Sequence, residues 1–361
     1  MPEYKRIVSE EVIHILFIAR TYPPLVGGME RFASDFYHYI RELTPVKLIA
    51  NPIGKRNLLF FFLKVMGYLI LHGRKYDLVH FNDAILAPLV PIIRLFSSAK
   101  ITFTVHGLDI VYRKFGYQQL VIPFLRQADK IFPVSHYTRT QCIQRRIPED
   151  KCEIIPNGLD FSSVAPGREK TVEMPSIPLK EKVNQKTILL TLGRLIPRKG
   201  HAWFIENVFT NLPEDYVYLI AGAGPETDNL ENLIQVEGLS ERVFLLGYVT
   251  DQEKIRLLQT ADLFIMPNIQ DQNDQEGFGI VLLEAGRYGL PSVAADIEGI
   301  RDAVIHGLSG SLVPEKDADA FITAIKNPVP SGNKITEILR EKFDWQVISR
   351  LYLQAFKDLV H

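Results

Sequence analysis

The chain alternates between short apolar runs rich in β-branched residues and longer stretches with helical spacing, and this alternation occurs in both halves. Such a pattern predicts parallel β-sheets whose strands are connected by crossover helices. A helix is expected from about Met29 to Leu43. Strands are expected at 12–19, 46–50, 77–83, 101–107, 130–135, 152–158, 187–193, 216–222, 243–249, 261–267 and 290–296. The sequence therefore predicts an α/β protein with two Rossmann-like domains of similar size.

A chain of 361 residues is too long for one ordinary hydrophobic core, which also favours two domains. Residues 161–186 are polar, rich in Ser, Pro and Lys, and interrupt the alternation. We therefore place the first domain at 1–165, a linker at 166–186 and the second domain at 187–343. Apolar positions with helical spacing over 344–361 predict a C-terminal helix.

The amino-acid composition and charge limit which binding partners are expected. Apolar residues make up 47% and charged residues 23%, the balance of a soluble globular protein, and a formal net charge of −1 gives no indication of nucleic-acid binding. Residues 1–160 carry +7 and residues 161–361 carry −8. Either the first half faces an anionic partner or the charges are distributed by chance. Two isolated cysteines and the lack of an apolar leader predict a reduced, cytoplasmic protein without a metal site.

One apolar stretch, LLFFFLKVMGYLIL at 58–71, raises the question of a membrane. It is too short to span a bilayer, which takes about 20 residues. Cations flank it on both sides, namely Lys55, Arg56, Arg74 and Lys75. Two interpretations remain: a buried helix of the first domain, or a helix that also touches an anionic membrane surface.

Ligands of open parallel sheets bind outside the carboxyl ends of the strands, so the loops at those ends are the candidate site. In GRLIPRKG (193–200), Arg194 and Lys199 lie beside an expected helix start near Gly200. Two cations and free helix N–H groups favour an anion such as a diphosphate. The alternative is solvated surface charge at a turn.

Gly27 and Gly28 follow the first expected strand and precede a helix, where backbone can approach a ligand closely. A simple turn is the alternative, and no GxGxxG dinucleotide fingerprint follows this strand. His106 ends another expected strand. A lone histidine is more often structural, but this position at a cleft favours a role in the reaction. His80 has a similar position and a weaker case.

The stretch EGFGIVLLE (276–284) places Glu276 before a Gly-Phe-Gly turn and Glu284 inside an expected helix. If the intervening residues are helical, both carboxylates lie near one face. Such carboxylates suit a ligand with hydroxyls at both ends, since each accepts two hydroxyl hydrogen bonds. The alternative is a helix-capping Glu276 and a buried, paired Glu284.

Together these segments resemble the retaining GT-B glycosyltransferases of family 4, the glycogen-synthase-like group. The matching segments cover almost the whole chain in order: YPPLVGGMERF, TVHGLD, PVSHYT, PNGLD, GRLIPRKG, AGAGPE, LLGYV, EGFGIVLLEAGRYGLP and DAVIHGLSGSLV. The combination of R-x4-K (194–199) with E-x7-E (276–284) is specific, although neither motif alone would be. The resemblance implies two domains facing a cleft, with a last helix that crosses back to the first domain.

The resemblance also implies roles. Glu284 would bind the nucleotide ribose, and Glu276 would contact the donor sugar near the reacting centre. Arg194 and Lys199 would neutralise the leaving diphosphate, with His106 beside the transferred sugar. The implied donor site comprises Gly27, Gly28, Arg194, Lys199, Tyr248, Val249, Glu276, Gly277, Phe278, Gly279, Ile280 and Glu284.

The activity implied is metal-independent, retaining transfer of a hexose-type sugar from a nucleotide diphosphate sugar. The acceptor would be a glycan or a lipid-linked molecule of cell-surface polysaccharide or glycolipid synthesis, so the protein would be cytoplasmic or peripheral on the inner face of the membrane. A nucleotide-sugar epimerase and a non-catalytic scaffold are the alternatives. The chain departs from the usual motifs at Glu298, where glycine is common, and at Arg287 and Tyr288, where small residues are usual.

Overall fold

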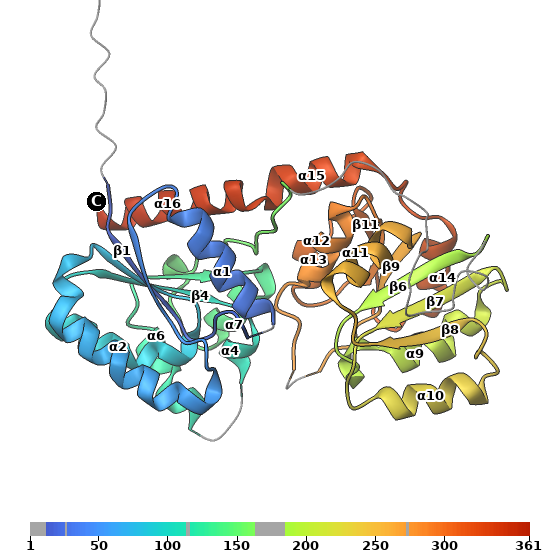
Figure 1. Cartoon of the computed structure of the whole chain (residues 1–361), viewed down its shortest axis with the longest axis horizontal. Helices are drawn as coiled ribbons and strands as arrows, with labels where there is room; N and C mark the ends of the chain where they lie inside the picture. Colours follow the sequence, from blue (N-terminus) through green and yellow to red (C-terminus); the bar gives the residue numbers. More distant parts are fainter. Residues whose placement is uncertain (1–11, 26, 113–115, 163–184, 272–273) are drawn as a thin grey trace, which may run out of the picture.

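The computed structural model describes residues 12–25, 27–112, 116–162, 185–271 and 274–361. Two domains lie side by side, each built on a parallel sheet with helices on its faces (Figure 1). The prediction of two parallel α/β domains is therefore confirmed. The predicted linker at 166–186 and the domain boundary before it lie almost entirely outside the described residues.

The first sheet has the strand order β2-β1-β3-β4-β5, and all its pairings are parallel. All five residues of the interior strand β1 are buried, because helices cover both faces of such a sheet. The strands are β1 Ile15–Ala19, β2 Val46–Ala50, β3 Leu78–Phe81, β4 Lys100–Val105 and β5 Lys130–Pro133. The helices are α1 Gly28–Ile40, α2 Leu58–His72, α3 Val90–Phe96, α4 Leu108–Val111, α5 Tyr117–Leu120, α6 Ile122–Leu125 and α7 His136–Gln144.

The second sheet has the order β11-β10-β9-β6-β7-β8, again with parallel pairings only. Its strands are β6 Thr187–Leu192, β7 Tyr216–Ala221, β8 Val243–Gly247, β9 Leu263–Met266, β10 Ser292–Ala295 and β11 Gly310–Val313. Its helices are α9 His201–Asn207, α10 Thr227–Val236, α11 Asp251–Thr260, α12 Ile280–Arg287, α13 Ile300–Ala303, α14 Ala318–Lys326 and α15 Asn333–Phe343. Short 3₁₀ turns occur at η1 Lys55–Asn57, η2 Gly73–Lys75, η3 Ala84–Leu89, η4 Glu149–Lys151, η5 Pro197–Lys199 and η6 Phe209–Asn211.

Two strand predictions need correction. The predicted strand at 152–158 was wrong, because this segment forms only one bridge, between Cys152 and Ile131 at the edge of the sheet. Pro156 follows soon after and has no N–H to continue the ladder. Conversely, the sequence analysis missed β11, a short four-residue strand whose two middle residues are only half-buried.

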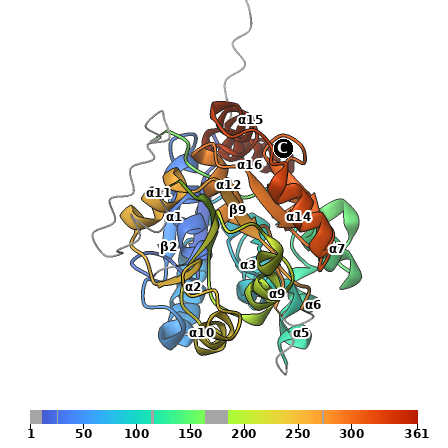
Figure 2. The same ribbon diagram turned by 90° about the vertical axis from the view of Figure 1, so that its right-hand side faces the viewer.

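The C-terminal helix α16 (Trp345–Val360) crosses back to the first domain and packs against α1 (Figure 1). The ring centroids of Phe32 and Trp345 lie 5.4 Å apart, and those of Phe36 and Tyr352 lie 5.0 Å apart. In the view along the long axis, α15 and α16 lie at the same edge of the molecule (Figure 2). The expected return of the last helix is confirmed.

The apolar stretch at 58–71 forms α2, which packs on the first domain through Phe61, Val65 and Leu69. At 15 residues it is shorter than a bilayer-spanning helix. Within the described parts of the chain, no helix is both long and apolar enough to cross a membrane.

Candidate donor-binding cleft

The loops between the two domains enclose two adjoining pockets, with volumes of about 590 and 310 Å³. We call them the Glu284 pocket and the Glu276 pocket after the carboxylate that each contains. Both pockets are lined from α1 of the first domain and from the start of α12 of the second. Four residues line both, namely Gly28, Arg31, Asp35 and Ile280. The two pockets therefore adjoin one another between the domains.

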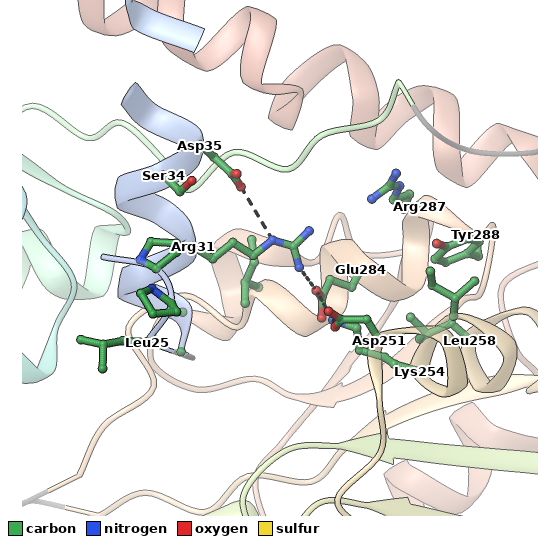
Figure 3. A pocket seen from close by; sticks show the side chains of 16 residues that line it. Leu25, Arg31, Ser34, Asp35, Asp251, Lys254, Leu258, Glu284, Arg287 and Tyr288 are labelled. Carbon is green, nitrogen blue, oxygen red and sulfur yellow. Dashed lines mark hydrogen bonds and ion pairs between the residues drawn. The ribbon is translucent and has the colours of Figure 1, made fainter. Parts of the chain in front are cut away.

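In the Glu284 pocket, the carboxylate lies between two cations from different elements (Figure 3). Arg31 on α1 donates through Nη1 to Oε1 of Glu284 at 2.5 Å, and Lys254 on α11 donates to the same oxygen at 3.0 Å. Helix α11 is fixed at its start by a capping box between Thr250 and Glu253, which places Lys254 in the second turn. In this pocket, one oxygen of the Glu284 carboxylate therefore accepts hydrogen bonds from two cations.

In the Glu276 pocket, the carboxylate belongs to a dense buried network. Oε2 of Glu276 accepts hydrogen bonds from Lys199 at 2.6 Å, from Arg198 at 2.8 Å and from Asn268 at 3.3 Å. Burial alone would raise the pKa of Glu276, but Lys199 and Arg198 outweigh it and lower the pKa to about 2. Glu276 is therefore ionised at neutral pH and orients both cations.

Arg198 is a functional candidate that the sequence analysis missed. Its side chain is only 8% exposed and pairs through Nε with Asp274 at 3.0 Å as well as with Glu276. The predicted Arg194 is 67% exposed and approaches Asp274 only to 3.8 Å. The R-x4-K spacing selected Arg194 and Lys199, whereas the tight turn η5 directs Arg198 and Lys199 to the same carboxylate. The presence of three cations in the 194–199 loop was the sequence feature that could have made Arg198 a candidate.

The turn at Glu298 and Gly299 makes hydrogen bonds with the backbone of Glu276. Oε2 of Glu298 accepts a hydrogen bond from the Glu276 N–H at 2.5 Å, and the Gly299 N–H donates to the Glu276 carbonyl at 3.0 Å. Glu298 has a φ of 47°, an uncommon value for a non-glycine residue. Burial raises the pKa of Glu298 to about 7. The unusual glutamate at this turn thus serves to anchor the Glu276 loop.

His106 lies in the wall of the Glu276 pocket, at the end of β4. Its Nε2 is buried and has no hydrogen-bond partner among the described residues. Burial lowers the pKa of His106 to about 4, so the imidazole is neutral at pH 7. Its backbone N–H donates to Asp109 at 2.8 Å, and burial together with nearby Asp83 raises the pKa of Asp109. A neutral histidine with an unused nitrogen is suited to a ligand hydroxyl.

The glycines that line the cleft have different structural roles. A Cβ on Gly277 would lie 1.9 Å from the carbonyl oxygen of His106, so the Glu276 loop touches the first domain through bare backbone. Gly279 has a φ of +85° and turns the chain into α12. A Cβ on Gly28 would meet no atom of the described residues within 4 Å, which leaves space at the start of α1.

The structure brings most of the predicted site together. Gly27 and Gly28 line the Glu284 pocket, while His106, Arg194, Glu276 and the 277–280 backbone line the Glu276 pocket. Lys199 reaches the site through its bond to Glu276.

One expectation fails. Residues 276–279 are not helical, because α12 begins at Ile280, so Glu276 and Glu284 do not share a helix face. Tyr248 is 76% exposed and, like Val249, is not among the residues that line these two pockets; both residues follow β8, at the edge of the second sheet.

Comparison with known proteins defines the family. The model described as Glycosyltransferase Family 4 matches residues 13–163, and the model described as Glycosyl transferases group 1 matches residues 176–338. Together they span both domains. The chain therefore belongs to the group 1, family 4 glycosyltransferases, which use nucleotide-sugar donors, and it has their GT-B fold.

Among curated relatives, an Escherichia coli UDP-Gal:alpha-D-GlcNAc-diphosphoundecaprenol alpha-1,3-galactosyltransferase is 30% identical over 278 residues, which is 72% of this chain and 67% of the relative. A GDP-mannose-dependent alpha-(1-6)-phosphatidylinositol monomannoside mannosyltransferase of Mycolicibacterium smegmatis is 29% identical over 66% of this chain and 63% of its own length. About a third of each relative thus lies outside the match. Among solved structures, Anabaena HepE in complex with UDP-glucose matches with a TM-score of 0.71 at 21% identity, over 96% of this chain and 100% of the other.

Proposed function

We propose that the protein is a retaining glycosyltransferase that moves a hexose-type sugar from a nucleotide diphosphate sugar to a glycan or lipid-linked acceptor. The product would belong to a cell-surface polysaccharide or glycolipid. One observation carries this proposal: the pocket that contains Glu284 adjoins the pocket in which Glu276 holds the cations Lys199 and Arg198. The names of the two relatives, which use UDP-galactose and GDP-mannose, support the substrate class.

The two pockets match the two ends of such a donor. Glu284 is placed to accept ribose hydroxyls in the larger pocket, while Gly28 at the start of α1 leaves room for the diphosphate. The sugar then reaches the smaller pocket, between His106 and the Glu276 loop. The neutral His106 would exchange a hydrogen bond with a sugar hydroxyl through its unused Nε2.

The chemistry follows from the charges. When the bond from the sugar to the diphosphate breaks, positive charge develops on the sugar and negative charge on the leaving phosphate. Lys199 and Arg198 are held in place by Glu276 before the donor arrives, so they stabilise the leaving group without reorganisation. Contact between the domains would exclude water from the broken bond. The proposal assigns neutralisation to these side chains and needs no metal ion.

The test is the thermal stability of the full chain with UDP, GDP and ADP and with their sugar conjugates, each with and without magnesium. A ligand at 100 times its Kd should add about 2.7 kcal/mol to the free energy of unfolding. We expect one base to stabilise the protein without magnesium. A panel without any stabilising nucleotide would contradict the proposal and favour a non-catalytic scaffold. Interconversion of a donor sugar without an acceptor would favour an epimerase.

We further propose that α2 places the enzyme on an anionic membrane surface, where a lipid-linked acceptor would reside. Its outer face exposes Leu59, Phe60, Leu63 and Leu71, with exposed fractions of 75, 66, 50 and 75%. Exposed cations lie along and beside the same helix, at Arg56, Lys64, Arg74 and Lys75. The helix contains no acidic residue, so its charge is complementary to anionic lipid.

Sedimentation with vesicles of phosphatidylglycerol and phosphatidylcholine tests this surface. We expect binding at low salt that decreases as salt rises, and a large loss in the Phe60→Ser, Leu71→Ser double variant. Phe61 is unsuitable for this test because it is 2% exposed and belongs to the core. Val236→Ser, on α10 of the other domain, is the matched control. Equal binding by the double variant and the control would contradict the membrane proposal.

A further inference from the structure

Arg31 makes the ion pair that joins the two domains inside the Glu284 pocket. It extends from α1 in the first domain to Oε1 of Glu284 on α12 in the second, across 253 positions of sequence (Figure 3). Within α1 its Nε lies 3.7 Å from Asp35, which supports the side chain from one turn further along. Arg31 also lines both pockets.

The second cation on Glu284 does not depend on the first domain. Lys254 belongs to α11, so it would stay beside Glu284 if the domains moved apart. A lysine ammonium on a flexible stem fixes the direction of a carboxylate less well than a planar guanidinium does. Arg31 also makes the shorter of the two contacts with Oε1, 2.5 Å against 3.0 Å for Lys254, and so contributes to the orientation of Glu284.

One oxygen of this carboxylate remains open to a ligand. Both cations bind Oε1, and Oε2 of Glu284 makes no hydrogen bond within the described ranges. A donor hydroxyl can thus bind Oε2 while Arg31 and Lys254 keep their places on Oε1. The ion pair and the ligand then do not compete for the same atom.

We propose that Arg31 is an interdomain positioning residue, whose ion pair with Glu284 completes the ribose site of a nucleotide donor only when the domains are closed. This inference rests on the proposed function, because it takes Glu284 as the residue that receives the nucleotide. The Arg31 side chain is 41% exposed, and a solvated ion pair of this kind contributes little by itself. Without a ligand, the ion pair between Arg31 and Glu284 therefore does not prevent the two domains from moving apart.

Binding and closure must then favour each other. The nucleotide binds best where Arg31 holds Glu284, and by reciprocity the nucleotide stabilises the closed arrangement by the same factor. A ligand in the pocket also removes water from the ion pair, which strengthens it. The donor would thus draw the two domains together before transfer.

The test is a calorimetric titration with the nucleoside diphosphate that stabilises the wild-type protein most. We expect Arg31→Ala to weaken binding about tenfold, within the usual range of coupling between sites. Arg31→Lys should recover part of this loss. Arg41→Ala is the matched control, since Arg41 follows the same helix, stacks on Tyr37 at 5.3 Å and lines neither pocket.

A double variant shows whether Arg31 acts through Glu284. Arg31→Ala combined with Glu284→Gln should bind no more weakly than Glu284→Gln alone. The nucleotide should also reduce the radius of gyration in X-ray scattering for the wild type, and less for Arg31→Ala. In kinetics, the donor KM should rise more than kcat falls.

The outcomes separate the two proposals. If the wild type binds no nucleotide, the proposed function itself fails. If the wild type binds but Arg31→Ala binds equally well, only the positioning role is overturned. Losses that multiply in the double variant would also overturn it, because they would show that Arg31 contacts the ligand independently of Glu284.

Discussion

The two carboxylates of the 276–284 segment are held in opposite ways. Among the described residues, Glu276 has three side-chain partners, Lys199, Arg198 and Asn268, and all of them belong to its own domain. Glu284 has two, and one of these, Arg31, comes from the other domain. The comparison teaches that one short motif supplies a site that a single domain preorganises and a second site that depends on contact between domains.

The largest expected effect concerns the self-contained site. Lys199→Ala removes a fixed cation from the proposed leaving group, and it should lower kcat/KM by about 10²–10³. A coupled assay of nucleoside diphosphate release would measure this. Lys326→Ala, an exposed lysine at the end of α14, is the matched control. Unchanged turnover in Lys199→Ala would show that the preorganised cluster is not the catalytic one.

Glu276→Gln should cost stability, because it leaves two buried cations with weaker partners. The expected loss is about 3 kcal/mol at pH 7. Since the folded pKa of about 2 lies below the ordinary 4.5, ionised Glu276 stabilises the fold above pH 4.5, and this contribution is lost as pH falls towards 2. Urea unfolding across this range should show the wild type approaching the variant as the solution becomes acidic. A constant difference would contradict the network.

Glu298→Gln tests the support beneath Glu276. Because burial raises the pKa of Glu298 to about 7, its ionisation opposes folding between pH 4.5 and 7. The wild type should therefore lose stability relative to the variant as pH rises through this window, and the difference should then level off. Urea unfolding at pH 4.5, 6 and 8 would measure it. A gain of relative stability with rising pH would refute the assignment.

The smallest effect should come from Arg194. Its side chain is 67% exposed and lies 3.8 Å from its carboxylate partner, whereas Arg198 is 8% exposed. We expect Arg194→Ala to lower kcat/KM less than about tenfold, in keeping with the modest worth of exposed ion pairs. Steady-state kinetics of Arg194→Ala and Arg198→Ala side by side would measure this. A larger loss in Arg194→Ala would restore the R-x4-K interpretation.

The fold was predictable because strands buried on both faces form continuous apolar runs, as in the wholly buried β1 and β9. The run at 152–158 looked similar, but it lies at a sheet edge and pairs only near Cys152. Short β11 carries too little apolar sequence to be recognised. Periodicity thus identifies central strands more securely than edge strands.

The site was predictable only within single loops. Glycines and charges in the loops after strands predicted Gly28, Lys199 and Glu276 as candidates, and the spacing within EGFGIVLLE added Glu284. Arg198 escaped because spacing cannot tell which of two neighbouring cations a tight turn directs inward. The Arg31–Glu284 pair escaped because its partners are 253 positions apart, and only the packing of two domains brings them together.

The most direct measurement compares the affinities of a nucleoside diphosphate and its sugar conjugate for the wild type, Glu284→Gln and Glu276→Gln by calorimetry. Glu284→Gln should weaken both ligands equally, since both contain the ribose. Glu276→Gln should weaken the sugar conjugate more than the nucleoside diphosphate, because only the conjugate places a sugar beside residue 276, whereas both ligands present a diphosphate to Lys199 and Arg198. The reverse pattern, or equal losses in both variants, would contradict the division of the cleft into two differently held sites.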